Sequence, residues 1–180
     1  MNFDELSQSR VPMKLNIGYG DHFIGDVRMD LTYSKAVNII ADAHFLPFRE
    51  CSFSDILCTE VMEHLDSPFQ ALSEMKYVLT NEGRIFITVP NLTEIRRIMS
   101  NSKNPYKIRS EVTLHKQGWD ATEFQHLTRI LGLKVEDISW IDWYGRENRR
   151  EKYKFLNPIL RVILPKNLYH THMKIICSRI

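Results

Sequence analysis

The chain has 180 residues, enough for one domain with a substantial core, and 43% of them are hydrophobic, as is ordinary in globular proteins. A formal net charge of +2 argues against a dedicated nucleic-acid-binding protein. Three cysteines without a CxxC pair or a metal-ligand spacing indicate a reducing, cytoplasmic location and predict neither a disulfide framework nor a metal site.

The first informative stretch is KLNIGYGDHFIGDVRMDL (14–31), which follows a polar lead-in over residues 1–12 that does not resemble a signal peptide. It predicts two short strands joined by a glycine turn. Gly18 and Gly20 follow the first strand at once, where the backbone can turn sharply and a ligand can come close. The second strand ends in Asp30, where an acid can accept hydrogen bonds from the hydroxyls of a ribose.

The connection between these strands, from Gly20 to about Asp26, is too short for the usual crossover helix, which needs roughly ten or more residues. A dinucleotide-binding fold needs that helix because its N-terminus holds the pyrophosphate. S-adenosylmethionine (SAM) carries no phosphate and can be bound without it. The connection therefore favours a SAM site, although an ordinary turn between two strands is the simpler interpretation of a lone glycine motif.

The stretch LNIGYG resembles motif I of class I SAM-dependent methyltransferases, in particular the methyltransferase-11-like group, whose first crossover is shortened. This resemblance implies that the cofactor contacts the turn and the tip of the second strand, at Gly18, Tyr19, Gly20, Asp30 and Leu31. Tyr19 departs from the pattern of that group, which has a small residue or cysteine there. The departure matters little if only the backbone of Tyr19 faces the ligand.

A third short strand is predicted over residues 38–41, followed by the segment ADAHFLPF (41–48). This segment resembles the ADAxxLPF stretch of the same group. The resemblance implies that Asp42 accepts a hydrogen bond from the amino group of adenine and that the backbone of Ala43 lies beside the ring. The alternative is that Asp42 only stabilises a turn, which is common for aspartate.

The fourth predicted strand covers residues 53–59 and leads into EVMEHL (60–65), which resembles the EVLEHL segment of the group. Glu60 follows the carboxyl end of this strand, where open α/β sheets bind ligands. It could face the amino group or the sulfonium of SAM. His64 is a candidate base, although a single histidine is more often structural.

A helix is predicted from Ser67 as N-cap, with Pro68 in its first turn and Gln70 at capping-box spacing. The expected apolar face comprises Phe69, Leu72, Met75 and Leu79, and Asn81 and Gly83 are expected to stop the helix. A strand over 84–89 and a short helix over 92–100 follow.

Residues 101–119 are polar and irregular, and end in a cluster in which His115 could take a proton from an acceptor hydroxyl. Trp119 could stack on a sugar or only pack in the core. A helix capped by Asp120 and Glu123 should follow, ended by Gly132. Its expected apolar stripe is Phe124, Leu127, Ile130 and Leu131, and the last two strands are expected over 134–140 and 172–180.

The segment 142–170 joins the last two strands; it is basic in its first half and apolar in its second. A helix packed on the sheet, with a solvated basic stretch, is one interpretation. The other is a flap over the acceptor site that recruits an anionic substrate or makes peripheral contact with an acidic membrane surface through residues 146–164.

Together, these elements predict an α/β fold with a Rossmann-like, seven-stranded, mostly parallel sheet, one antiparallel strand, helices on both faces and shortened first crossovers. We expect a single domain over 1–180, with 92–119 and 142–170 on the substrate side. The resemblance implies SAM-dependent methyl transfer. The histidines and Trp119 favour a hydroxyl of a small molecule or glycan precursor as the acceptor, and the sequence indicates neither a nucleic-acid partner nor a metal site. A non-catalytic SAM-binding protein and an NAD-dependent oxidoreductase are the alternatives.

Overall fold

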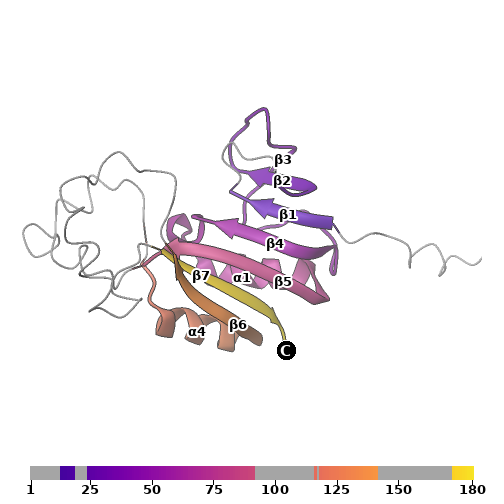
Figure 1. The fold of residues 1–180 in the computed structure, drawn as a ribbon. Coiled ribbons are helices and arrows are strands. Elements are labelled where there is room, and N and C mark those ends of the chain that lie inside the picture. The colour runs from indigo at the N-terminus through magenta and orange to yellow at the C-terminus, as the bar shows by residue number, and fades with distance from the viewer. Residues whose placement is uncertain (1–12, 19–23, 92–115, 117, 142–171) are drawn as a thin grey trace, which may run out of the picture.

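The computed structural model describes residues 13–18, 24–91, 116, 118–141 and 172–180, which form one seven-stranded sheet (Figure 1). The strands are β1 (Met13–Ile17), β2 (Val27–Asp30), β3 (Ile39–Ile40), β4 (Phe53–Thr59), β5 (Leu79–Pro90), β6 (Leu133–Ile141) and β7 (His172–Arg179). The described helices are the short 3-10 helix η1 (Met62–His64), α1 (Pro68–Val78) and α4 (Ala121–Ile130). Among the described residues, no helix is both long enough and apolar enough to span a bilayer.

The strand order is β3-β2-β1-β4-β5-β7-β6. Strands β3, β2, β1, β4 and β5 pair in parallel, whereas β7 runs antiparallel to both β5 and β6. The predicted sheet, mostly parallel with one antiparallel strand, is therefore confirmed. The strand order reverses between β1 and β4, which makes their carboxyl ends the topological switch point where open α/β sheets bind ligands.

The shortened crossovers are held by polar side chains. Between β2 and β3, residues 31–38 form no helix. The Asn38 side chain instead accepts the Arg28 backbone N–H at 2.6 Å and donates to the Asp26 carbonyl at 3.1 Å. The Arg28 guanidinium donates to the carbonyls of Ala36 and Gly25. Side-chain hydrogen bonds thus satisfy loop backbone groups that a crossover helix would otherwise satisfy internally.

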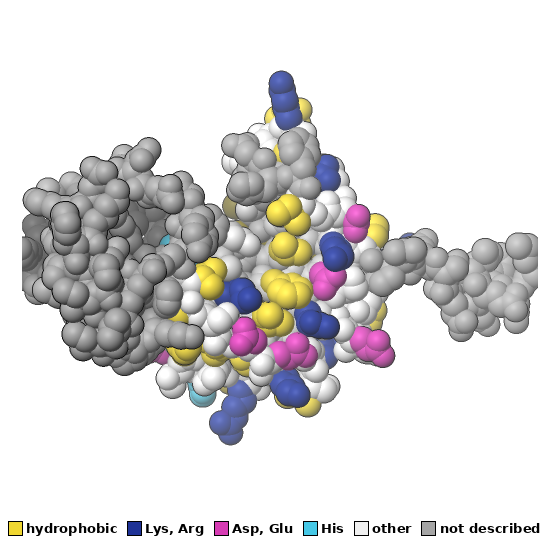
Figure 2. Space-filling model, viewed as in Figure 1, with side chains coloured by type: hydrophobic (Ala, Val, Ile, Leu, Met, Phe, Trp, Pro, Cys, Tyr) yellow, Lys and Arg dark blue, Asp and Glu magenta, His cyan; other side chains and the backbone are white. Residues whose placement is uncertain are grey.

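Helices α1 and α4 contribute to one core together with alternating residues of the central strands. From α1, the fully buried side chains are those of Ala71, Leu72, Met75 and Val78. Two predicted core positions are wrong: Phe69 is 47% exposed and Ile130 is 58% exposed. Three residues outside the predicted apolar faces are buried as well: Ala71 and Val78 of α1 and Thr128 of α4. In Figure 2, hydrophobic side chains cross the opposite face of the sheet, amid Lys, Arg, Asp and Glu.

The helix boundaries follow local chemistry. The Ser67 hydroxyl accepts the Gln70 N–H, as predicted for the start of α1. For α4 the whole predicted capping box is present, with Asp120 and Glu123 each accepting the other's backbone N–H. α1 ends at Val78, before the predicted stop at Gly83. A Cβ at Gly83 would lie 2.6 Å from Leu79 Cδ1 and 2.9 Å from the Ser54 carbonyl, so this glycine serves packing within β5.

The turn after β1 places Gly18 against the loop after β4. Gly18 has a φ of +71°, and a Cβ built on it would lie 1.9 Å from Val61 Cγ2. Both the left-handed backbone and the close contact exclude a side chain at this position.

We expect Gly18→Ala to lower the free energy of unfolding by about 2–5 kcal/mol, because the left-handed conformation and the overpacking each add a cost. In the double variant Gly18→Ala/Val61→Ala, part of this loss should be recovered, since the clashing methyl group is gone. Urea unfolding of the two single variants and the double variant measures the coupling. Strictly additive losses would contradict the close contact between residue 18 and Val61.

Candidate functional site

The carboxyl edge of the sheet carries a row of functional side chains whose order follows the strand order. Asp42 follows β3, Asp30 ends β2, Gly18 follows β1 and Glu60 follows β4. His172 begins β7, and because β7 is antiparallel, its first residue meets the same edge and pairs with Pro90 at the end of β5. The topology thus brings residues from across the sequence to one edge.

The glycine turn lies at the centre of this row. The Gly18 N–H donates to the Met29 carbonyl at 2.9 Å, which ties the turn to β2. Tyr19 and Gly20 lie outside the described residues. Residues 24–26, the described end of the connection, are not helical. The described part of the turn therefore offers open backbone beside two parallel strands.

Asp30 is held by its own turn. One carboxylate oxygen, Oδ1, accepts the Thr32 backbone N–H at 3.0 Å and the Thr32 hydroxyl at 3.1 Å. Within the described part of the chain, Oδ2 has no hydrogen-bond partner. Leu31 beside it is 65% exposed, an unusual state for a leucine at a strand tip. The carboxylate is oriented by one oxygen and presents the other, next to an exposed apolar side chain.

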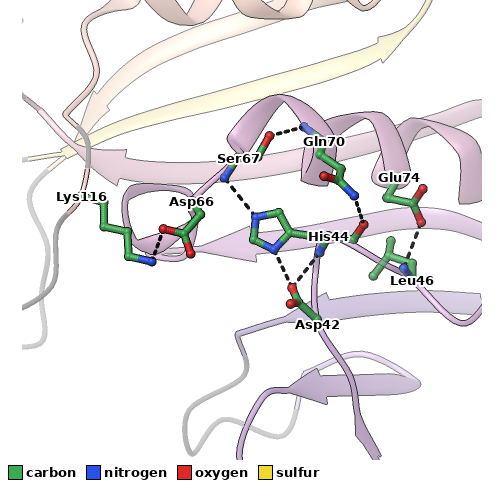
Figure 3. A network of polar contacts seen from close by, with 8 residues as sticks. All are labelled: Asp42, His44, Leu46, Asp66, Ser67, Gln70, Glu74 and Lys116. Carbon is green, nitrogen blue, oxygen red and sulfur yellow. Dashed lines mark hydrogen bonds and ion pairs between the residues drawn. The ribbon is translucent and has the colours of Figure 1, made fainter.

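The Asp42 carboxylate, like that of Asp30, is held through one oxygen by the residue two positions further on, which here is His44 (Figure 3). Its Oδ1 accepts the His44 backbone N–H at 2.9 Å and lies 2.6 Å from His44 Nδ1. The backbone N–H of His44 is the largest cause that lowers the pKa of the Asp42 carboxyl, and the imidazole adds to it, against an opposing effect of burial. Asp42 is therefore ionised at neutral pH. Ala43 is buried.

Glu60 occupies a strained position at the tip of β4. Its φ is +56°, a left-handed conformation that costs a non-glycine residue on the order of 1–3 kcal/mol and is common at functional sites. Its N–H donates to the Thr88 carbonyl at 3.0 Å, and its Oε1 accepts the Thr88 hydroxyl at 3.2 Å. Its Oε2 lies 3.1 Å from His172 Nε2. These contacts across β4, β5 and β7 fix the carboxylate and orient an imidazole.

Sequence reasoning missed His172. Its side chain is 16% exposed, against 24% for Glu60, so the pair lies at the surface but is largely shielded from solvent. The sequence feature that could have identified His172 as a site residue was its place as the first residue of the final strand. Since that strand was expected to be antiparallel, its beginning had to meet the carboxyl edge of the parallel strands.

The two predicted catalytic histidines have different outcomes. His64 ends η1, its side chain is 40% exposed, and its Nε2 lies 3.9 Å from Oε1 of the buried Glu63. His115 lies outside the described residues. The next residue, Lys116, donates its backbone N–H to the Glu63 carbonyl at 2.8 Å and pairs with Asp66, so the chain at residue 116 passes beside η1.

Three further reactive or polar side chains belong to the core. Burial raises the pKa of the Cys58 thiol, and raises that of Cys177 to about 12, so both stay protonated. Trp119 is 8% exposed, forms a parallel bridge with Asn91 and packs edge-on against Phe124 at a centroid distance of 5.4 Å. These contacts favour the packing interpretation of Trp119 over stacking on a substrate.

The row of side chains suits SAM. A side chain at residue 18 would clash with Val61, so only backbone is presented there, and the carboxylates of Asp30 and Asp42 can accept hydrogen bonds on one side of this turn. Glu60 adds a negative charge on the other side, which suits a cationic sulfonium or ammonium. A dinucleotide would instead need donors for two phosphates, and the connection between β1 and β2 is too short for the crossover helix that usually supplies them.

Comparisons with known proteins agree with this geometry. Residues 20–87 match the sequence model of a protein family whose description is "Methyltransferase domain". A curated relative, an uncharacterized protein of Methanocaldococcus jannaschii, is 32% identical over 74 residues, which make up 41% of this chain and 32% of the relative. The match therefore spans about a third of that relative's length.

Solved structures share the fold at low sequence identity. A SAM-dependent methyltransferase from Archaeoglobus fulgidus superposes with a TM-score of 0.64 at 16% identity, covering 92% of this chain and 85% of that chain. A methyltransferase from Haloferax volcanii, solved with the Trm112 methyltransferase activator, gives a TM-score of 0.62 at 13% identity, covering 92% and 80%. The match in sequence and the match in fold agree: residues 20–87 are similar to the methyltransferase domain family, and the described fold is that of solved SAM-dependent methyltransferases.

Proposed function

We propose that this chain transfers the methyl group of SAM to a hydroxyl group of a small molecule or glycan precursor. The observation that carries the proposal is the division of the carboxyl edge at Gly18. Nucleoside-type acceptors, Asp30 and Asp42, lie toward β3, and a carboxylate–imidazole pair, Glu60 and His172, lies toward β7. Such a pair can act as a general base. A hydroxyl acceptor needs a general base because the hydroxyl proton must be removed during methyl transfer.

On the cofactor side, Gly18, Tyr19 and Gly20 would line SAM with backbone, and Asp30 would accept hydrogen bonds from the ribose hydroxyls. The exposed side chain of Leu31 and the backbone of Ala43 would cover the adenine, with Asp42 accepting from its amino group. When bound, SAM supplies a methyl group that is already activated by the positive sulfonium. The chain therefore needs to align the acceptor, exclude water and receive a proton.

On the acceptor side, His172 would receive that proton. Glu60 Oε2 lies 3.1 Å from Nε2 and would keep the ring oriented. The imidazolium that forms would be stabilised by the Glu60 carboxylate, which Thr88 keeps in position. His64 and His115 are the other candidate bases, and 92–119 and 142–170 are the proposed substrate-side segments.

Two alternatives remain distinguishable by experiment. A non-catalytic SAM-binding protein would bind SAM without turnover of labelled methyl groups. An NAD-dependent oxidoreductase would bind NADH instead. The short connection between β1 and β2 favours SAM, since a dinucleotide site needs a crossover helix there to hold its pyrophosphate.

Asp30→Ala should weaken SAM binding by about 1.5–3 kcal/mol, because charge-assisted hydrogen bonds to the ribose are lost. Isothermal titration calorimetry measures this difference. Glu82→Ala, which removes an exposed carboxylate near the opposite end of β5, is the matched control and should leave the affinity unchanged. Equal affinities for wild type and Asp30→Ala would remove Asp30 from the site, and wild-type binding of NADH but not SAM would overturn the proposed function.

His172→Gln should lower kcat by about 10²–10⁴-fold while SAM affinity stays the same, because glutamine retains a donor toward Glu60 but cannot take up the proton. The measurement is S-adenosylhomocysteine release in the presence of a small-molecule and glycan-precursor extract. His126→Gln on the exposed side of α4 is the control. A full rate in His172→Gln with a loss in His64→Gln would assign the base to His64 instead.

Replacement of Arg149, Arg150 and Lys152 by glutamine should raise the acceptor KM at unchanged SAM affinity if the basic segment recruits an anionic acceptor. Added salt should mimic the replacement because it screens exposed charges. Rates across a salt series, with binding to acidic and neutral vesicles measured in parallel, separate acceptor recruitment from membrane contact. Equal KM values throughout, with no vesicle binding, would leave only the structural interpretation.

A further inference from the structure

We propose that His44 is a positioning residue of the cofactor site, which fixes the Asp42 carboxylate for the nucleoside by linking it to the start of α1. This inference rests on the proposed function, because it concerns the same SAM site. It assigns a role to a side chain that neither the sequence motif nor the family resemblance singles out.

The first half of the link joins His44 to Asp42. Oδ1 of Asp42 lies 2.6 Å from the Nδ1 atom of the imidazole and accepts the backbone N–H of the same histidine at 2.9 Å. Both contacts go to one oxygen, so the second oxygen of the carboxylate keeps its lone pairs for a ligand. The Asp42 side chain is 44% exposed, so the carboxylate group is partly accessible from solvent.

The second half joins His44 to α1 (Figure 3). The imidazole Nε2 accepts the backbone N–H of Ser67, the N-cap of α1, at 3.1 Å. The side-chain amide of Gln70 donates to the His44 carbonyl at 3.0 Å. Since Nε2 accepts a hydrogen bond, the neutral ring carries its proton on Nδ1, which therefore donates to Asp42. One tautomer of His44, with its proton on Nδ1, can therefore make both hydrogen bonds: Nε2 accepts from the start of α1 and Nδ1 donates to the Asp42 carboxylate.

This link also explains a departure from the predicted cap. In a full capping box, the Gln70 side chain would bond to the backbone N–H of Ser67. Here His44 takes both partners: its ring accepts the Ser67 N–H and its carbonyl accepts the Gln70 amide. The start of α1 is therefore completed by a residue from the loop after β3.

The loop after β3 depends on such an anchor. Strand β3 is an edge strand of only two residues, and the described crossover before it contains no helix. α1, by contrast, is fixed in the core by fully buried residues such as Leu72 and Met75. Its Glu74 also accepts the Leu46 N–H at 3.0 Å. The loop that presents Asp42 is thus positioned by α1 as well as by the pairing of β3 with β2.

The test is a double-mutant cycle on S-adenosylhomocysteine binding, measured by isothermal titration calorimetry. If His44 acts through Asp42, His44→Ala should weaken binding about tenfold in the wild-type background, the effect of losing a hydrogen bond to a charged group. In the Asp42→Ala background the same change should alter affinity by less than about twofold. His126→Ala, on the exposed side of α4, is the matched control and should have no effect.

Thermal unfolding of each variant identifies any loss of folded protein. If the His44→Ala variant does not fold, the cycle is repeated with His44→Asn and with His44→Gln. The Asn amide can lie near the position of Nδ1, and the Gln amide near that of Nε2. Equal losses of affinity in both backgrounds, or no loss in the wild-type background, would overturn the role of His44 while leaving the SAM site intact. Failure of the wild-type chain to bind S-adenosylhomocysteine or SAM would instead overturn the proposed function itself.

Discussion

The close contact between Gly18 and Val61 is the constraint on which the arrangement of the site depends. It presses the turn after β1 against the loop after β4, where the strand order reverses. Because Val61 fills the space beside Gly18, no side chain fits at residue 18 and the turn consists of backbone alone there. From this point the edge divides into a side with nucleoside-type acceptors and a side with a carboxylate–imidazole pair. The strand order alone keeps the two sides apart.

The short crossovers of the first strands change what must stabilise the cofactor side. In a βαβ unit, the packed helix holds the loops at the carboxyl edge. Here the described crossover between β2 and β3 is held by Asn38 and Arg28, and the loop after β3 is held by His44 and Glu74. Polar side chains with fixed partners therefore take the place of apolar packing around the proposed nucleoside site.

Much of the fold could be predicted from the sequence, because local signals agree with tertiary structure there. The cap at Asp120 and the glycine turn after β1 are local, and the structure has both. The prediction that Phe69 is buried was wrong. Sequence spacing defines which residues share a face of the helix, but the elements packed against α1 decide which part of that face is buried. The pair of Glu60 and His172 could not be predicted from local pattern, since it forms only when β7 returns antiparallel beside β5.

The most direct test of the account is a crystal structure of the chain with S-adenosylhomocysteine. The account predicts the ribose against Asp30, the adenine beside Asp42 and Ala43, and the sulfur directed past Gly18 toward Glu60 and His172. A ligand bound in the reverse direction, with its adenine toward Glu60, would contradict it. A ligand bound away from the carboxyl edge of β1 and β4 would contradict it more completely.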